Sequence, residues 1–132
     1  MLKQIDHVGI AVRNLDKMIQ VYQDTLGVEC SGIEVIEEQK VRVGMLPVGE
    51  VNIELLESTD PEGPIAKFIE RNGEGFHHIA YRVENIEEEL ATLKEKGIRL
   101  IDETYRIGAH NAKIAFLHPK SMGGVLVELV EK

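Results

Sequence analysis

Cysteine, tryptophan and aromatic residues in general are scarce in this sequence. Its 132 residues include one cysteine, Cys30, no tryptophan, three phenylalanines and three tyrosines. A single cysteine excludes an internal disulfide bond and a zinc site built on several thiolates. So few aromatic side chains offer little for stacking the bases of a single-stranded nucleic acid. No apolar run approaches the ~20 residues that a transmembrane helix requires, so we expect neither a disulfide-rich scaffold nor a membrane-spanning protein.

Positive charge is also in the minority. Lysine and arginine total 15 against 23 aspartates and glutamates, which gives a formal net charge of -8 at pH 7. Such a chain repels a phosphate backbone, and no basic stripe interrupts its acidic field, so we expect no nucleic-acid partner. The first ten residues, MLKQIDHVGI, lack the basic start, apolar middle and small-residue cleavage site of a secretory signal. The expected location is the cytoplasm.

What the sequence does contain is an internal repeat. The stretch "DHVGIAV" at residues 6–12 resembles "HHIAYRV" at residues 77–83. Aligning the two superposes the pairs His7/His78, Val12/Val83 and Asn14/Asn85, each 71 positions apart. Self-similarity of this kind indicates a duplicated module.

Each copy continues in the same way. A helix is predicted over 15–26 and over 86–96, because Asn14 and Asn85 are good N-caps, apolar residues recur at helical spacing, and Gly27 and Gly97 are typical stops. Strand-like stretches follow at 33–38, 40–46 and 50–57 in the first copy, and at 98–107, 112–118 and 125–131 in the second. We therefore predict an α+β fold of two tandem βαβββ modules in one domain of residues 1–132. Module 1 covers about 1–57, a connector with a short helix about 58–75, and module 2 about 76–132.

The two modules also end alike, since "VNIELLE" and "VLVELVE" superpose Glu54 on Glu128. A lone histidine in a strand is usually a satisfied structural side chain, and a lone strand glutamate usually faces solvent. Here both residue types recur at equivalent positions, which favours a functional set made of His7, Glu54, His78 and Glu128. If pseudo-twofold symmetry brings them together in a cupped mixed sheet, two imidazoles and two carboxylates suit a divalent transition metal ion. The repeat selects His78 over its neighbour His77, which we interpret as structural.

Four stretches carry a family resemblance: "DHVGIAV", "PIAKFIERNGEGFHHIAYRV", "IGAH" and, most specifically, "HPKSMGGVLVEL". Together they resemble the vicinal oxygen chelate (glyoxalase-like) superfamily and, more closely, its methylmalonyl-CoA epimerase family, over nearly the whole chain. The resemblance implies an isomerase that interconverts (2R)- and (2S)-methylmalonyl-CoA by abstracting the C2 proton through a metal-stabilised enolate. It also implies a divalent ion (cobalt, manganese, nickel or zinc), a CoA thioester as substrate and a homodimer.

Carried over residue by residue, the family's metal ligands fall on His7, His78 and Glu128, with the remaining position at Glu54, where some members have glutamine. We expect Glu54 and Glu128 to act as the catalytic pair, one as base and one as acid. A further glutamate, proposed as a base in some members, aligns near Val43, where this chain has no carboxylate.

Substrate contacts are less sharply defined by the sequence. His110, His118 and Lys120 are candidates for binding substrate, although a solvent-facing loop histidine and a surface turn lysine are the competing interpretations. The CoA phosphates need local positive charge in an acidic chain, and five cations are available for that role: Lys40, Arg42, Arg106, Lys113 and Lys120.

Other functions compete with the epimerase hypothesis. A glyoxalase I (lactoylglutathione lyase) type of isomerase shares the metal set, but "HPKSMGGVLVEL" and the double histidine argue against it. An extradiol dioxygenase needs two histidines and one carboxylate, and the fourth candidate, Glu54, argues against that. A metal-cup ligand-binding protein is a non-enzymatic alternative, and such a binder would more often have lost the metal residues.

Overall fold

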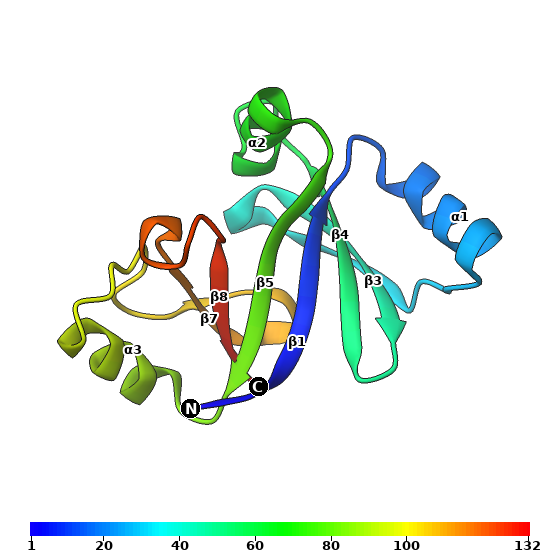
Figure 1. The fold of residues 1–132 in the computed structure, drawn as a ribbon. Helices are drawn as coiled ribbons and strands as arrows, with labels where there is room; N and C mark the ends of the chain where they lie inside the picture. Colours follow the sequence, from blue (N-terminus) through cyan, green and yellow to red (C-terminus); the bar gives the residue numbers. More distant parts are fainter. The chain divides into compact units, whose positions relative to one another are not determined.

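The computed structural model describes all residues from 1 to 132 and has the predicted α+β class (Figure 1). The order strand, helix, three strands occurs twice, which confirms the βαβββ prediction. The first copy consists of β1 (Leu2–Ala11), α1 (Leu15–Leu26), β2 (Gly32–Ile36), β3 (Val41–Val48) and β4 (Val51–Ser58). The second consists of β5 (Gly75–Val83), α3 (Ile86–Glu95), β6 (Arg106–Ile107), β7 (Lys113–Leu117) and β8 (Val127–Glu131). Between the copies lies α2 (Pro64–Asn72).

The chain divides into two compact units, one of residues His7–His77 and one of Met1–Asp6 together with His78–Lys132. The boundaries fall inside β1 and β5, directly before His7 and His78. In the first unit the strand order is β2-β3-β4-β1, and in the second it is β5-β8-β7-β6. Both orders contain a parallel pair, β1 with β4 and β5 with β8, next to antiparallel hairpin-type pairs.

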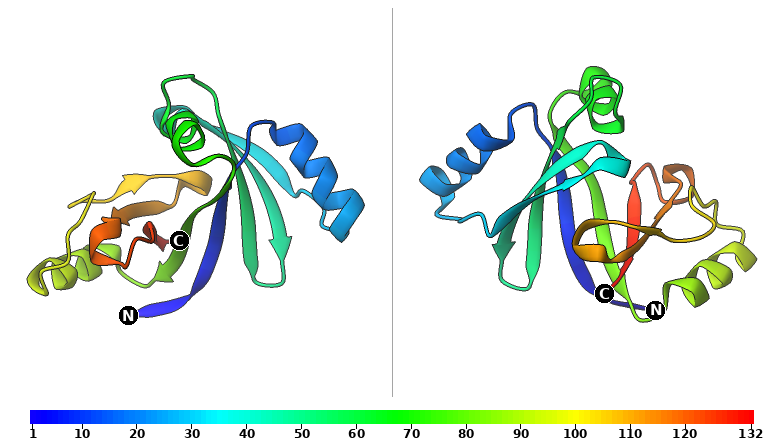
Figure 2. Two further views of the ribbon diagram at one scale, coloured as in Figure 1. Left: turned by 45° about the horizontal axis from the view of Figure 1, so that its top comes forward. Right: turned by 180° about the vertical axis from the view of Figure 1, so that it is seen from behind.

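In the first unit, α1 packs on β3 and β4 and lies beside them in each view (Figure 2). The helix begins where the Asn14 side chain accepts a hydrogen bond from the backbone of Lys17, and it ends at Gly27, whose φ of 69° is left-handed. Leu15 and Leu55 are among the residues of the core under this helix. A Cβ on Gly44 would stand 3.0 Å from a Leu15 methyl carbon, so glycine permits the close approach of β3 to the helix.

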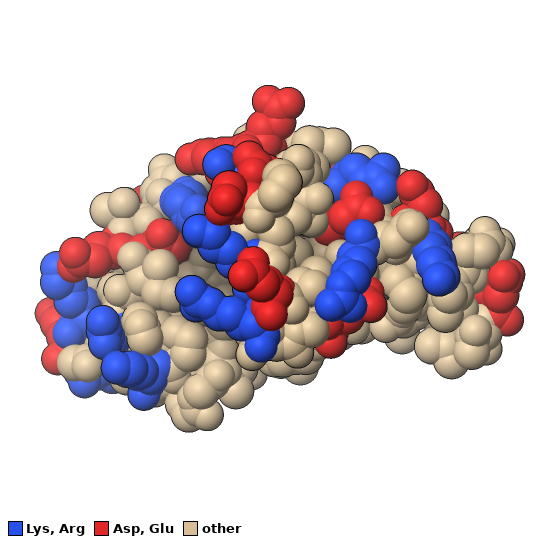
Figure 3. Space-filling view, turned by 90° about the horizontal axis from the view of Figure 1, so that it is seen from above, with Lys and Arg blue, Asp and Glu red and all other residues tan.

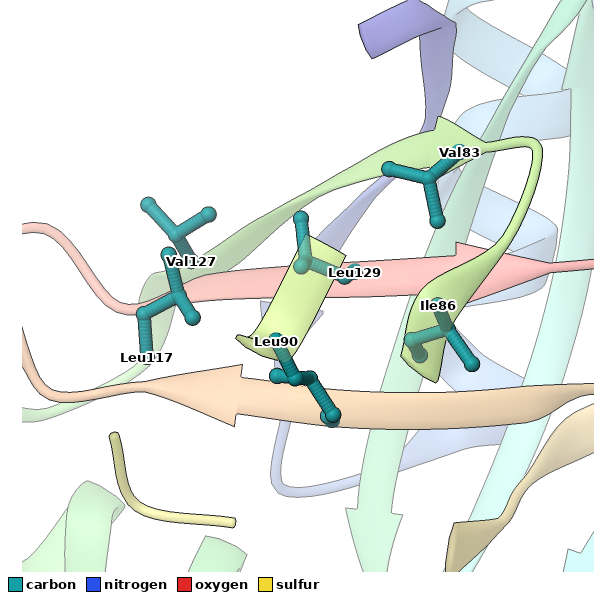
Figure 4. Packing of buried hydrophobic residues seen from close by; sticks show 7 residues of the cluster. Val83, Ile86, Leu90, Leu117, Val127 and Leu129 are labelled. Carbon is teal, nitrogen blue, oxygen red and sulfur yellow. The ribbon is translucent and has the colours of Figure 1, made fainter. Parts of the chain in front are cut away.

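In the second unit, an apolar cluster joins α3 to the sheet (Figure 4). Asn85 caps this helix as predicted, by accepting a hydrogen bond from the backbone of Glu88. The cluster takes side chains from β5, α3, β7 and β8: Val83, Ile86, Leu90, Ala115, Leu117, Val127 and Leu129. Because these residues alternate along their strands with residues of the opposite face, that opposite face of β5 and β8 carries His78 and Glu128 beside the buried Ala80 and Val130.

The strand predicted over 98–107 is wrong for most of its length. Only Arg106 and Ile107 form a strand, and Leu100 makes a single bridge to Leu117. The physical reason is Asp102, whose carboxylate accepts a hydrogen bond from the backbone of Phe116 and so takes the place of a strand partner there. The remaining predicted strands match within a few residues.

The predicted connector helix is confirmed as α2. Phe68 on this helix meets the ring of His77 edge to face, with 4.8 Å between ring centroids, so His77 has a packing contact of its own. None of the helices combines the length and the apolar character needed to cross a membrane.

Candidate active site

The four side chains that the repeat singled out are all buried. His7, Glu54, His78 and Glu128 expose only 4% to 6% of their surface. Histidine and glutamate are rarely buried to this extent without a partner, because removing a charged or polar group from water is unfavourable unless another group compensates it. Each half contributes one histidine and one glutamate, and each half is described separately below.

In the first unit, His7 and Glu54 are brought together by a parallel strand pair. In the register of β1 and β4, Glu54 stands opposite Gly9, two residues beyond the histidine on the same face. The imidazole Nδ1 of His7 lies 3.3 Å from Oε2 of Glu54. Gly9 has no side chain, so nothing at that position separates the two polar groups. Met45 on β3 is the cross-strand neighbour of Glu54 on its other side.

The second unit repeats this arrangement. Glu128 on β8 stands opposite Ala80 on β5, which is again two residues after the histidine. The imidazole Nε2 of His78 lies 2.9 Å from Oε1 of Glu128. Phe116 on β7 pairs with Glu128 in register and meets the His78 ring edge to face, with 5.6 Å between centroids. An apolar ring against the imidazole fixes its orientation and keeps solvent from that side.

The chemistry of these pairs suits a divalent metal ion. Neutral imidazole nitrogens and carboxylate oxygens are the ligand types that zinc, cobalt, nickel and manganese accept. Within each pair the possible ligand atoms lie within 4.8 Å of one another and are buried. The chain therefore has candidate His/Glu metal ligands in both halves.

Asp6 is a buried site neighbour that sequence reasoning missed. Its side chain is 1% exposed and accepts a hydrogen bond from Nη2 of Arg82 at 2.9 Å, while Nζ of Lys132 lies 3.1 Å from the same oxygen, Oδ1. These contacts connect the start of β1 to the ends of β5 and β8, and Asp6 directly precedes His7 in the chain. The available signal was an acidic residue inside an otherwise apolar strand motif.

The predicted substrate-binding residues lie in two loops of the second unit. His110 is exposed and has a φ of 57°, and the next residue, Asn111, has a φ of 59°. Two consecutive non-glycine residues in the left-handed region are strained, and such strain is frequently found at functional loops.

His118 has a local structural contact. Its Nδ1 accepts a hydrogen bond from the backbone of Lys120 and caps the turn Pro119–Ser121. Partial burial, followed by the positive charges of Arg99 and Lys120, holds the pKa of His118 below its ordinary value. The neutral imidazole is the form that can accept this hydrogen bond.

Most of the cations considered for CoA phosphates are already engaged by carboxylates. The ion pairs are Lys40 with Asp60, Arg42 with Asp16 and Glu57, Arg106 with Asp102, and Lys113 with Glu131. The two carboxylates beside Arg42 raise the pKa of its guanidinium, with Asp16 contributing most. On the face drawn in Figure 3, basic and acidic side chains are interspersed. A phosphate would therefore compete with carboxylates of this chain at these four residues. Lys120, the fifth candidate cation, takes no part in these ion pairs.

A groove of about 460 Å³ lies elsewhere in the first unit, between the loop after α1 and the turn that joins β3 to β4. Its lining includes Cys30, Pro47 and Val48 but none of the His/Glu candidates. We assign it no part in the chemistry.

Comparisons with known proteins agree on one family. Residues 6–116 match the family described as the Glyoxalase/Bleomycin resistance protein/Dioxygenase superfamily. The human mitochondrial methylmalonyl-CoA epimerase is 41% identical over 129 residues, which cover 97% of this chain and 73% of that protein. The ethylmalonyl-CoA/methylmalonyl-CoA epimerase of Cereibacter sphaeroides is 39% identical, with 98% of each chain covered.

Solved structures give the same result. The methylmalonyl-CoA epimerase of Mycobacterium tuberculosis superposes with a TM-score of 0.94 at 40% identity, covering 98% of this chain and 88% of that one. The Streptomyces coelicolor enzyme, solved as a variant in complex with 2-nitronate-propionyl-CoA, superposes with a TM-score of 0.96 at 39% identity, covering 100% of this chain and 96% of that one.

Proposed function

Because this chain belongs to the methylmalonyl-CoA epimerase family of the glyoxalase superfamily, we propose that it interconverts (2R)- and (2S)-methylmalonyl-CoA. The observation that carries the proposal is the pair of buried His–Glu contacts, one in each half, at positions equivalent in the internal repeat. Similar proteins named as epimerases over nearly the full length support the choice of substrate.

His7, Glu54, His78 and Glu128 would together hold one divalent metal ion. Their donor set of two imidazoles and two carboxylates leaves coordination positions available for a substrate. When bound, the ion supplies Lewis-acid stabilisation of the negative charge that develops on the thioester carbonyl as C2 loses its proton. Cobalt, manganese, nickel and zinc are the ions proposed for this site.

Inversion at C2 needs a proton carrier on each face of the substrate. We assign Glu128 to one face and Glu54 to the other: a carboxylate oxygen takes the C2 proton as the C–H bond breaks, and the opposite carboxylic acid returns a proton to C2. The two roles exchange when the reaction runs in the other direction. The same chain position in both halves of the repeat supports this assignment.

His110, His118 and Lys120 would meet the CoA portion or the substrate carboxylate. Lys120 is the best placed for a phosphate because the other four cations are paired with carboxylates, and Lys120 is exposed. The homodimer and the cytoplasmic location stay predictions from the sequence.

The alternatives receive less support. A glyoxalase I type of isomerase or a metal-cup binding protein would be expected to match relatives of those kinds over the whole chain. The named relatives that match nearly all of it are epimerases.

The test is to incubate metal-stripped and metal-restored protein with each epimer of methylmalonyl-CoA in deuterated water. Deuterium uptake at C2 and inversion are followed together. We expect both to depend on the metal. If no metal-restored form shows either, with the fold intact by circular dichroism, the epimerase proposal is rejected.

A further inference from the structure

Strand β2 has an unusual distribution of side chains for the edge of a sheet. It is the outermost strand of its unit. Of its three apolar side chains, Ile33 and Val35 are 47% and 52% exposed, and Ile36 is half-buried. Glu34, between Ile33 and Val35, is half-buried and lies on the same face of the strand as Ile36. Hydrophobic burial favours the reverse arrangement, with the apolar residues covered and the carboxylate in water. Departures of this kind from local sequence rules are frequent at functional sites.

The register of the strands identifies the face that Glu34 occupies. Glu34 stands directly opposite Val43 on β3, and Val43 stands directly opposite Leu56 on β4. Residues opposite each other in antiparallel strands project from the same face of the sheet. Val43 is only 1% exposed, so this face is a covered one.

The same face carries the His7–Glu54 pair. Glu54 precedes Leu56 by two residues on β4, and residues two apart in a strand share a face. Glu34 is therefore a second carboxylate on the side of the sheet where Glu54 lies. Two strand spacings across and two residues along the strand separate the Cα atoms of Glu34 and Glu54 by about 12 Å.

The internal repeat shows that this edge position is used for charge in both halves. Val43 corresponds to Ile114, 71 positions later. Ile114 stands opposite Arg106 on β6, as Val43 stands opposite Glu34 on β2. Arg106 stacks over Phe116, with 5.7 Å from its guanidinium carbon to the ring centroid. Both halves thus place a long charged side chain at the same register position, with opposite sign.

We propose that Glu34 is a catalytic residue of the proposed epimerisation, carrying the C2 proton on the side of the His7–Glu54 pair. This rests on the proposed function. On that face Glu34 takes over the proton transfer assigned above to Glu54, and Glu54 serves to hold the ion. As the C2–H bond breaks, a carboxylate oxygen of Glu34 takes the proton and the electron pair passes to the thioester enolate. In the reverse direction Glu34 in its acid form returns a proton to C2, so no further reactant is needed.

The test compares Glu34→Gln with wild type on each epimer separately, in deuterated water. Glutamine keeps the shape of the side chain but cannot carry the proton. We expect inversion to fall at least ~100-fold, which is the lower end of the usual contribution of general acid–base catalysis. Deuterium uptake should persist from the one epimer whose C2 proton faces the other carboxylate. Glu34→Asp, which keeps the carboxylate, should recover part of the inversion.

Controls separate this role from a structural one. Glu38→Gln removes the same charge from an exposed position close by in the chain, and it should leave inversion unchanged. Elemental analysis should find the same bound metal in Glu34→Gln as in wild type. The role of Glu34 would be overturned if the rate of inversion by Glu34→Gln were within twofold of the rate by Glu38→Gln. Loss of deuterium uptake from both epimers, with metal still bound, would also overturn it. A wild type that shows neither reaction would reject the proposed function itself, and the role of Glu34 with it.

Discussion

At the scale of single residues, each half of the chain places an imidazole against a carboxylate inside a strand pair. The pairs use different ring nitrogens, Nδ1 in His7 and Nε2 in His78. Both glutamates stand opposite a small residue, Gly9 or Ala80, so that no side chain at that position separates the pair. The small residue two positions after each histidine thus allows the imidazole and the carboxylate to approach each other.

Glu128→Gln should stop one of the two proton transfers. Because glutamine cannot accept a proton, we expect inversion to fall by about 10²–10⁴ when the variant is assayed at saturating metal. Deuterium uptake should be lost from one epimer, and that epimer should be the one from which Glu34→Gln retains it. Glu95→Gln, exposed on α3, is the matched control. Undiminished uptake from both epimers, with metal bound, would contradict the assignment.

His118 should make stability depend on mildly acidic pH. Its pKa lies below the ordinary value of 6.5 in the folded state, because of burial first and then Arg99 and Lys120. The unfolded chain therefore binds a proton more readily than the folded one, so this group stabilises the fold above about pH 6.5 and loses that contribution as pH falls through its folded pKa.

The measurement is the melting temperature between pH 7.5 and 5 for wild type and His118→Asn. Asparagine can accept the same capping hydrogen bond without titrating in this range. The melting temperature of the variant should decline less on acidification, and the imidazole NMR signals of His118 should titrate below pH 6.5. Equal declines in both proteins would show that His118 does not contribute.

At the scale of elements, the last strand of each half supports the helix of the same half. The residue three positions after each site glutamate is again a glutamate. Oε2 of Glu57 accepts a hydrogen bond from the backbone of Leu15 at 2.7 Å, and Oε1 of Glu131 accepts one from Ile86 at 2.8 Å. Both contacts place a carboxylate at the N-terminus of a helix, where the exposed N–H groups and the helix dipole favour negative charge.

Glu131→Ala should lower the free energy of unfolding by about 1–2 kcal/mol, the usual effect of removing a helix cap with its charge. Urea denaturation monitored by circular dichroism measures it. Glu131→Gln keeps an acceptor and should lose about half as much. Glu50→Ala, in an exposed turn, provides the comparison and should stay within about 0.5 kcal/mol of wild type. A Glu131→Ala value equal to that of Glu50→Ala would show that the cap is dispensable.

At the scale of the whole molecule, the proposed ion would be held by ligands that come from both halves of the sequence. A ligand that binds only the folded state stabilises it by roughly 2.7 kcal/mol at 100 times its dissociation constant. For a domain of this size that corresponds to a rise of about 10 °C in melting temperature.

Adding the preferred metal to stripped protein should therefore raise the melting temperature. His7→Gln and His78→Gln test whether one ion is shared. If one ion is shared, each single substitution should remove most of the rise in melting temperature, because it leaves that ion with only one imidazole ligand. Two independent sites would instead leave about half of the bound metal in each variant, which would contradict a single shared ion. Differential scanning calorimetry with elemental analysis distinguishes these outcomes.

The repeated βαβββ order, the helix caps at Asn14 and Asn85, and the equivalence of His7 with His78 and of Glu54 with Glu128 were all predictable from the sequence. These are local patterns, or comparisons of one local pattern with another, and recognising them requires no knowledge of long-range contacts. Three features became visible in the folded chain alone: Asp6 is buried against Arg82, Asp102 interrupts the expected strand, and Glu34 lies on the covered face beside Val43. Each of these depends on which residue of a distant strand stands opposite. An alternation of period two gives two faces but does not say which one is covered, because register and burial are set by long-range pairing.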